Sequence, residues 1–573
     1  MNHLAKLHVL VLGLGHSGLA MARWCSAQGA QLRVWDSREQ PPQALALHEA
    51  VPSAVLLHGA LGEEQLAGVQ MVLKSPGLAP HDERIAPLLD AARANGIAIG
   101  NELTLFMRAL AELKAERRYA PKVLAITGTN GKTTTTAMTA LLVARCGHRV
   151  AAAGNIGPTM LDTLAAALAL EPVVESVPTA DLAVDAPRPA SLEAPGAAMA
   201  EAEVQADALE TAAAPLDDES ALQLAPPPPP EPVFEHLPEV WVLELSSFQL
   251  DGVQGFEPSA AAVLNITQDH LDWHGSMDAY VAAKARVFGE QAVMVINRDD
   301  LRVEAMVPPP VIVKGARGKR ATSVGRRVTR FGLDAPQRPG DFGLISEGGM
   351  AWLVRALEAD ETIKRKSGEE QEIHLQRLMP ADALRVRGRH NAANALAALA
   401  LAVAIGCPLA PMLHGLREYH GEPHRVAFIA SVGGIEAFDD SKGTNVGATV
   451  AALEGLGADK APGRLVVILG GDGKGQDFSP LAAPVARHAR AVALIGRDAD
   501  AIEAALLNSA VPMARHASLP EATRWCFEQA RAGDAVLLSP ACASLDMFRN
   551  YGHRSEVFVQ TVLALAADRG EMA

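Results

Sequence analysis

The chain alternates short apolar runs with longer stretches that suit helices. Apolar runs free of charge are typical of buried strands, and turn residues at their ends mark where each strand stops. Strands separated by helical stretches predict parallel sheets, so the expected fold class is α/β. The clearest expected strands lie at residues 7–12, 31–35, 69–73, 123–126, 240–244, 260–266, 464–469, 491–495 and 535–538, and the clearest expected helices at 19–28, 137–144 and 388–406.

The length of 573 residues exceeds what one hydrophobic core supports and predicts about three domains. The pattern divides into a Rossmann-like N-terminal domain over 1–117, a central P-loop ATPase-like α/β domain over 118–421, and a Rossmann-like C-terminal domain over 422–573. Polar and glycine residues collect where the strands end, which is the edge at which open α/β sheets bind ligands. Each domain is therefore expected to present a ligand-binding edge.

Most of the acidity lies in one segment. Residues 171–236 carry a net charge of −13 out of −15 for the whole chain, and they are rich in Ala, Pro and Glu. Such a composition buries too little apolar surface to offset the entropy of ordering, so a disordered insertion is expected over 168–237. A solvated spacer and a partner-binding arm are the two roles open to it.

Composition argues against several classes of protein. Outside that segment the net charge is close to zero, and the one basic stretch, residues 312–330, is expected to be an exposed loop, so no nucleic-acid partner is expected. Five scattered cysteines fit reduced thiols better than a disulfide framework. The N-terminal apolar run is expected to be a strand, and no stretch suits a membrane span. A cytoplasmic protein is therefore expected.

A glycine turn follows the first expected strand. It contains Gly15, His16, Ser17 and Gly18, and Asp36 follows the second strand. This pattern is the dinucleotide-binding fingerprint, in which phosphate lies at a helix N-terminus and an acid contacts a ribose or another polar group. It predicts a phosphorylated ligand but does not select NAD.

A second glycine turn follows the apolar run at 123–126. It reads Gly128-Thr129-Asn130-Gly131-Lys132-Thr133-Thr134 and precedes a helical run, which is the layout of a phosphate-binding loop. Ile126 stands where the standard spacing has a glycine, so this loop is shorter. Backbone N–H groups would face the phosphate oxygens, Lys132 would neutralise them, and the Thr133 hydroxyl could bind magnesium. The turn predicts binding of a nucleoside triphosphate.

Candidate metal ligands follow the neighbouring strands. Glu244 ends the strand at 240–244 and suits Mg²⁺, which prefers oxygen donors. His270 follows the strand at 260–266 within Asn-Ile-Thr-Gln-Asp-His, a setting that favours a ligand role. Lys284 lies in a helical stretch, where spacing alone predicts only a solvated face.

A series of motifs then occurs in a single order along the chain. They are Thr127-Gly-Thr-Asn-Gly-Lys-Thr-Thr134, Glu244-Leu-Ser-Ser-Phe-Gln-Leu250, Asn265-Ile-Thr-Gln-Asp-His270, Gly388-Arg-His-Asn391, Pro423-His-Arg425, Asp440-Ser-Lys-Gly-Thr-Asn445, Gly470-Gly-Asp-Gly-Lys474 and Ser539-Pro-Ala-Cys-Ala-Ser-Leu-Asp546. The series resembles the Mur ligases, ATP-dependent amide-forming enzymes of peptidoglycan precursor synthesis. The resemblance covers the chain except for about residues 168–237, and three of the motifs resemble members that use D-glutamate.

The resemblance implies three substrate regions. The sugar nucleotide would contact Gly15, His16, Ser17, Gly18, Asp36, Ser37 and, at its muramoyl-alanine end, Asn155. ATP would contact Gly128, Thr129, Asn130, Gly131, Lys132, Thr133 and Thr134, and its adenine and ribose would contact Asn297, Arg425 and Asp440. D-glutamate would contact Thr444, Lys474, Ser544, Leu545 and Tyr551.

The resemblance also implies catalytic residues Lys132, His270 and Lys284 and two Mg²⁺ ions. Thr133 and Glu244 would hold the first ion, and His270 would hold the second with an N-carbamylated Lys284. ATP, the co-substrate, would convert the carboxylate of UDP-N-acetylmuramoyl-L-alanine to an acyl phosphate, which the D-glutamate amine attacks. His270 and the Lys284 carbamate are both candidates for the base that deprotonates the amine. A monomer is the family's default.

Three alternatives compete with this interpretation. Another ligase of the same architecture could add a different amino acid, or add glutamate to folate, although Lys474 with Ser544 favours a dicarboxylic amino acid. A nicotinamide-dependent dehydrogenase would explain the first glycine turn but not Glu244, His270 and Lys284. A non-catalytic nucleotide-binding regulator with an acidic arm would leave the filled catalytic positions unexplained.

Overall fold

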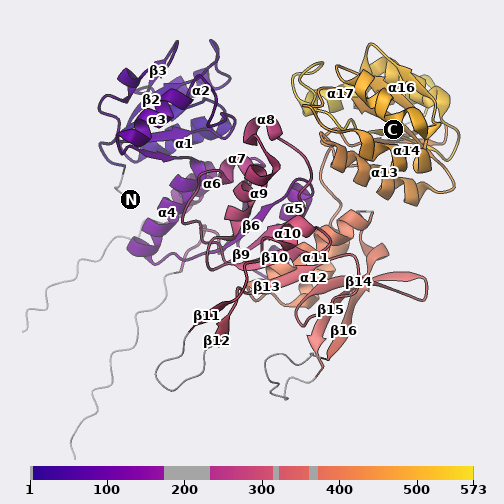
Figure 1. Ribbon diagram of the computed structural model, residues 1–573, viewed down its shortest axis with the longest axis horizontal. Helices are drawn as coiled ribbons and strands as arrows, with labels where there is room; N and C mark the ends of the chain where they lie inside the picture. Colours follow the sequence, from indigo (N-terminus) through magenta and orange to yellow (C-terminus); the bar gives the residue numbers. More distant parts are fainter. Residues whose placement is uncertain (1–3, 173–232, 314–321, 360–371, 387, 572–573) are drawn as a thin grey trace, which may run out of the picture. The chain divides into compact units, whose positions relative to one another are not determined.

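The computed structural model describes residues 4–172, 233–313, 322–359, 372–386 and 388–571. It has the expected α/β class, with three sheets of mostly parallel strands and flanking helices (Figure 1). Most of the predicted insertion lies outside the described residues. Its predicted ends are wrong, because helix α6 continues to Leu170 and Leu237 is fully buried. The ranges at which the chain divides into domains stay a prediction.

The first sheet has five parallel strands in the order β3-β2-β1-β4-β5. Its strands are β1 (His8–Leu12), β2 (Gln31–Trp35), β3 (Val55–Leu57), β4 (Met71–Lys74) and β5 (Ala98–Gly100), and its helices are α1 (His16–Ala27), α2 (Ala44–Ala50), α3 (Ala86–Ala94) and α4 (Glu102–Arg117). Helix α1 begins earlier than the expected residue 19. Gly18 allows this, since a Cβ atom there would lie 1.9 Å from the carbonyl oxygen of Gly13.

The second sheet has six parallel strands in the order β13-β10-β9-β6-β8-β7. Its strands are β6 (Lys122–Thr127), β7 (Val150–Gly154), β8 (Val240–Glu244), β9 (Ala260–Val263), β10 (Val293–Asn297) and β13 (Val328–Phe331). Its helices are α5 (Lys132–Arg145), α6 (Met160–Leu170), α7 (Ser247–Leu250), α8 (Leu271–His274), α9 (Met277–Ala285), α10 (Leu301–Glu304), α11 (Arg389–Ala404) and α12 (Leu409–Glu418).

The expectation of an exposed basic loop over 312–330 is wrong for its described part. Strand β11 (Val311–Val313) pairs antiparallel with β12 (Thr322–Val324), and β13 joins the edge of the second sheet. Arg326 donates to three backbone carbonyls, and Arg330 pairs with Glu304 at 2.6 Å. Arg326 and Arg330 are therefore used inside the fold, whereas Arg327 is exposed. A separate antiparallel sheet contains β14 (Phe342–Glu347), β15 (Met350–Glu358) and β16 (Ile373–Pro380).

The third sheet has the order β17-β18-β22-β19-β20-β21, and only the β17–β18 pair is antiparallel. Its strands are β17 (Ala427–Val432), β18 (Ile435–Asp439), β19 (Leu465–Gly470), β20 (Ala489–Ile495), β21 (Met513–Arg515) and β22 (Ala535–Leu538). Its helices are α13 (Val446–Lys460), α14 (Ala482–His488), α15 (Ala499–Leu506), α16 (Leu519–Gln529) and α17 (Tyr551–Asp568). Among the described residues, no helix is both long and apolar enough to cross a bilayer.

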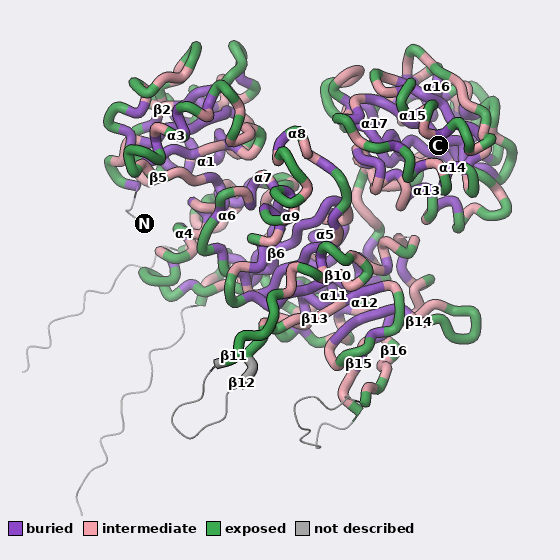
Figure 2. Tube along the Cα trace, in the orientation of Figure 1, coloured by how far each residue is buried: buried purple, intermediate pink, exposed green. Residues whose placement is uncertain are grey.

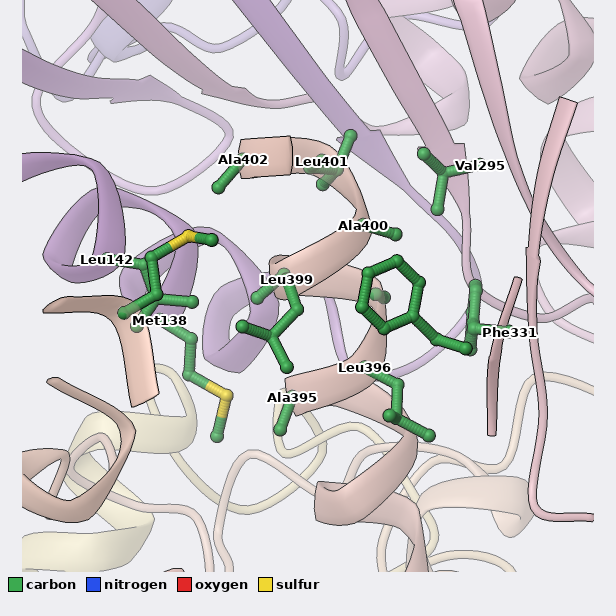
Figure 3. Close-up of a cluster of buried hydrophobic side chains, with 14 of the residues drawn as sticks. Met138, Leu142, Val295, Phe331, Ala395, Leu396, Leu399, Ala400, Leu401 and Ala402 are labelled. Atoms are coloured by element: carbon green, nitrogen blue, oxygen red, sulfur yellow. The ribbon is translucent and has the colours of Figure 1, made fainter. Parts of the chain in front are cut away.

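The core of the second sheet lies where α11 packs against helix α5. Leu396 and Leu399 of α11 are fully buried with Met138 and Leu142 of α5 and with Phe331 of β13 (Figure 3). Strands β6, β8 and β9 are buried along their length, apart from Lys122 at the start of β6 (Figure 2). Close packing on both faces fixes the strand ends that carry the polar residues described below.

Candidate active site

The loop between β6 and α5 is shaped by two glycines in backbone conformations that other residues rarely adopt. Gly128 has φ 152° and Gly131 has φ 81°. A Cβ atom on Gly131 would lie 2.6 Å from Oδ1 of Asn394, so the loop has no room for a side chain there. The Asn130 N–H donates to Oδ1 of Asn265 at 2.8 Å, which ties the loop to the end of β9. The loop is therefore held in place before any ligand binds.

Four basic side chains converge on this loop. Lys132 and Lys284 each donate to the carbonyl oxygen of Gly128 at 2.9 Å. Arg425 donates to Oγ1 of Thr133 at 2.8 Å, and Lys442 approaches the same atom at 3.4 Å. Cations gathered on a glycine loop at a helix N-terminus make a site for a polyanion such as a triphosphate.

Lys284 is not on a solvated helix face, which corrects the expectation from its spacing. Its side chain is buried, with the residue 2% exposed, and lies over the Tyr280 ring at 4.6 Å. Burial, with the nearby Lys132 charge, holds the pKa of Lys284 well below its ordinary value. The neutral amine favoured by this environment is the nucleophilic form of lysine.

Glu244 ends β8 and is buried, with the residue 1% exposed. Its Oε1 accepts a hydrogen bond from Nδ2 of Asn155 at 2.9 Å, whereas its Oε2 is buried without a partner. A buried carboxylate oxygen without a donor is costly unless a cation or water meets it. This oxygen therefore fits a magnesium ligand. Among the described residues, no three His, Cys, Asp or Glu side chains form a ready-made metal cluster.

His270 caps the short helix α8 in a left-handed conformation with φ 53°. Its Nε2 lies 3.5 Å from Oδ2 of Asp269, and its ring packs edge-on against Phe248. Burial lowers the pKa of His270 to about 4, opposed by the Asp269 charge. The ring is therefore neutral near pH 7, which is the form that can ligate a metal.

A cavity of about 300 Å³ adjoins the loop. It is lined by Asn130, Gly131 and Thr134 of the loop together with Asn297, Arg425 and Asp440. The structure thus brings together the residues expected at both ends of ATP. Asn297 donates to the carbonyl oxygen of Leu264 at 2.7 Å, and its Oδ1 accepts the Asp299 N–H at 3.0 Å, so both ends of its amide are held within the fold.

Asp440 faces this cavity from the end of β18. Oγ of Ser539 donates to its Oδ2 at 2.6 Å, and the residue is only 6% exposed. Burial raises the pKa of Asp440 to about 7, although the Ser539 hydrogen bond and the Arg425 charge oppose the shift. A hydroxyl donor from a ligand would stabilise the ionised form.

The first glycine turn is satisfied largely from within the fold. Gly15 precedes α1, His16 and Ser37 are exposed, and Oγ of Ser17 donates to Oε2 of Glu102 at 2.7 Å. Asp36 accepts the Leu14 N–H at 2.6 Å and pairs with Arg38 at 2.8 Å. Burial is the largest single influence on Asp36 and by itself would raise its pKa. The hydrogen bonds and the Arg38 charge together outweigh it and lower the pKa of Asp36 to about 2. Leu14 and Arg38 together donate four hydrogen bonds to this carboxylate, two to each oxygen, so a ribose would have to displace one of them.

The residues expected to bind D-glutamate follow neighbouring strands of the third sheet. Thr444 follows β18, Ser544 and Leu545 follow β22, and Lys474 follows β19. Ser544 is buried, Lys474 and Leu545 are exposed, and Tyr551 opens α17 with Lys442 over its ring at 5.7 Å. The structure gathers them at one sheet edge. It does not place them against the loop by any direct hydrogen bond among the described residues.

Three residues of the site were missed from the sequence. Lys442 approaches the loop, and Asn391 and Asn394 of α11 line the cavity. Lys442 and Asn391 lie inside two of the motifs, and Asn394 follows three residues after Asn391. Position within the motif was the available signal, because spacing alone does not say which side chains turn inward.

Comparison with known proteins agrees with this geometry. Family models for the Mur ligase MurD-like N-terminal domain, the Mur ligase middle domain and the Mur ligase glutamate ligase domain match residues 7–100, 233–402 and 424–542. The chain belongs to the Mur ligase family and is a ligase.

Its relatives include three proteins named UDP-N-acetylmuramoylalanine--D-glutamate ligase. The one from Albidiferax ferrireducens is 54% identical, covering 100% of this chain and 98% of the relative. Those from Polaromonas sp. and Burkholderia mallei are 48% and 50% identical, covering 100% and 98% of each chain respectively. The solved structure of UDP-N-acetylmuramate-alanine ligase from Thermotoga maritima is 18% identical with a TM-score of 0.51, covering 98% of this chain and 100% of that one, which supports the fold alone.

Proposed function

We propose that the chain joins the amine of D-glutamate to the carboxylate of UDP-N-acetylmuramoyl-L-alanine, with ATP as co-substrate. The observation that carries this proposal is the convergence of Lys132, Lys284, Arg425 and Lys442 on the Gly128–Thr133 loop. Relatives that cover the whole chain and bear the name of this D-glutamate ligase support the choice of substrates.

The proposed reaction has two steps. A carboxylate is a poor electrophile, so an oxygen of the alanyl carboxylate first attacks the γ-phosphorus of ATP and ADP leaves. The loop N–H groups and Lys132 stabilise the charge on the transferring phosphoryl group. The D-glutamate amine then attacks the acyl carbon, and phosphate leaves with the carboxylate oxygen. The cations on the loop would also hold the phosphate in place for this second step.

Magnesium fits the side chains at the loop. The unpartnered Oε2 of Glu244 and the Thr133 hydroxyl would hold one ion, and His270 with a carbamylated Lys284 would hold a second. Bound there, the ions would neutralise phosphate charge. The burial of Lys284 supports its carbamylation, because a neutral amine can add to carbon dioxide. The resulting carbamate would lie among cations.

The low pKa of His270 bears on which group deprotonates the amine. A ring with a pKa of about 4 is neutral near pH 7 but is a weak proton acceptor. His270 and the Lys284 carbamate both stay candidates for this base. A cytoplasmic, monomeric enzyme that acts on small molecules, without a nucleic acid or membrane partner, stays our prediction.

The test is phosphate release with ATP, Mg²⁺ and UDP-N-acetylmuramoyl-L-alanine across D-glutamate, L-glutamate, L-alanine, diaminopimelate and lysine. Release with D-glutamate alone supports the proposal. Release with another amino acid would move the enzyme to a different ligation step. No release with any of them would favour the non-catalytic regulator.

A further inference from the structure

Glu102 opens helix α4, but its carboxylate is used by two other elements. Its Oε2 accepts from Oγ of Ser17 at 2.7 Å, in the first glycine turn. Its Oε1 accepts from the backbone N–H groups of Met160 at 2.7 Å and Leu161 at 3.3 Å, in the first turn of α6. The residue is 1% exposed. One buried side chain therefore joins the sugar-nucleotide turn to the N-terminus of α6.

The N-terminus of α6 directly follows the turn that holds Asn155. The Gly154 N–H donates to the carbonyl oxygen of Pro158 at 3.1 Å, which closes this turn. Asn155 in turn donates its side-chain amide to Glu244, the candidate magnesium ligand, and its backbone N–H to the Glu244 carbonyl. A shift at the start of α6 would therefore move Asn155 relative to Glu244.

Helix α6 has a local cap besides Glu102. Oγ1 of Thr159 donates to Asp162 at 2.7 Å and accepts its N–H at 3.2 Å, which leaves the Met160 and Leu161 N–H groups to Glu102. Burial raises the pKa of Glu102, opposed by its hydrogen bonds from Ser17, Leu161 and Met160. Burying a carboxylate is costly, and here it yields a link between elements distant in sequence.

We propose that Glu102 is a positioning residue that holds the sugar-nucleotide turn at Ser17 in register with the Asn155 turn and thereby with Glu244. The proposal rests on the proposed function, because it assumes that both turns contact one UDP-sugar substrate. Glu102 acts through its neighbours and touches no reacting atom.

The test compares KM values in Glu102→Ala and Glu102→Gln. The Ala variant should raise KM for UDP-N-acetylmuramoyl-L-alanine about tenfold, as expected when hydrogen bonds to a charged group are lost, and leave KM for ATP within about twofold. The Gln variant should stay near wild type, because its amide oxygen can accept from α6 and its NH₂ can donate to Ser17. A general loss of structure would not separate the two KM values in this way.

Arg23→Gln is the matched control. It removes the Arg23–Asp162 ion pair at 2.6 Å, which joins α1 and α6 without involving Glu102. It should leave both KM values unchanged. The proposal would be overturned if Arg23→Gln raised the KM for UDP-N-acetylmuramoyl-L-alanine as much as Glu102→Ala does. It would also be overturned if Glu102→Ala raised the KM values for this substrate and for ATP equally, or raised neither.

Two further measurements keep the outcome decisive. If Glu102→Ala does not fold, Glu102→Asp replaces it, since its carboxylate is one methylene too short to span both partners and should raise the same KM. If the wild-type chain shows no turnover, the proposed function fails by itself. Calorimetric binding of the UDP-sugar then decides the inference, and equal affinity in the wild type and the substituted chain would overturn it.

Discussion

The two glycine turns of this chain share a layout but differ in what surrounds them. Each follows a parallel strand and opens a helix, at Gly15–Gly18 and at Gly128–Gly131. Around the first, Ser17 and Asp36 are paired inside the fold. Around the second, Lys132 and Lys284 both donate to the Gly128 carbonyl oxygen, and Oε2 of Glu244 is buried without a partner.

The strand–turn–helix unit by itself therefore supplies only a phosphate-sized cradle. The chemistry comes from side chains that neighbouring strands and helices bring to it. A turn whose polar groups are hydrogen-bonded within the fold can hold a ligand with little reorganisation. A turn surrounded by basic side chains has its charge balanced when an anionic ligand binds. We therefore propose that the first turn binds substrate and that phosphoryl transfer takes place at the second.

The largest effect should come from Lys132→Ala. Loss of the loop cation should lower kcat by at least about 10³-fold, because it stabilises charge that develops in phosphoryl transfer. Binding of the UDP-sugar, measured by calorimetry, should be unchanged. Lys122→Ala, on the exposed start of β6, is the control and should behave as wild type. Normal turnover by Lys132→Ala would remove the distinction between the turns.

Asp440→Asn should change how stability depends on pH. The folded pKa of about 7 lies above the ordinary value of 3.8, so protonation stabilises the fold fully below pH 4 and this contribution is lost as pH rises through 7. The loss amounts to roughly 4 kcal/mol at most. Denaturant unfolding at pH 5 and pH 8 gives the free energy of unfolding, which should fall less between these pH values in the variant than in the wild type. An equal fall in the two proteins would count against a raised pKa at Asp440.

Leu399→Ala should destabilise the fold behind the second turn. Leu399 is fully buried against α5, and truncation leaves a cavity that costs about 3 kcal/mol. Thermal unfolding should therefore occur at a lower temperature. The KM values for ATP and for UDP-N-acetylmuramoyl-L-alanine should be unchanged at temperatures where the variant is folded, because the Leu399 side chain contacts no expected ligand. A selective rise in KM for ATP would mean that α11 packing sets the loop geometry.

The smallest effect should come from replacing residues 173–232 with a short Gly-Ser linker. The Glu235 N–H donates to the Glu171 carboxylate at 3.2 Å, so the flanks are close enough to join. Loop length has little effect on stability, and kcat should stay within about twofold. A large loss in the initial-rate assay would show that this segment acts on one of the turns.

The sequence predicted the elements well where apolar runs were bounded by turn residues. Strands β2 and β22 have the expected bounds, and the motifs lie at strand ends as expected. The burial of Lys284 could not be read from spacing, because its partners Thr127 and Gly128 are distant in sequence. The contacts of Arg326 and Glu102 also join residues distant in sequence, so no local pattern reveals them.

Activation of the substrate carboxylate by ATP is tested most directly by following the oxygen of that carboxylate. UDP-N-acetylmuramoyl-L-alanine labelled with ¹⁸O in that carboxylate would be incubated with ATP, Mg²⁺ and D-glutamate, and the released phosphate analysed by mass spectrometry. An acyl phosphate formed at the second turn predicts one ¹⁸O atom in each phosphate. Unlabelled phosphate would mean that water attacks ATP, which would contradict activation of the carboxylate at this loop.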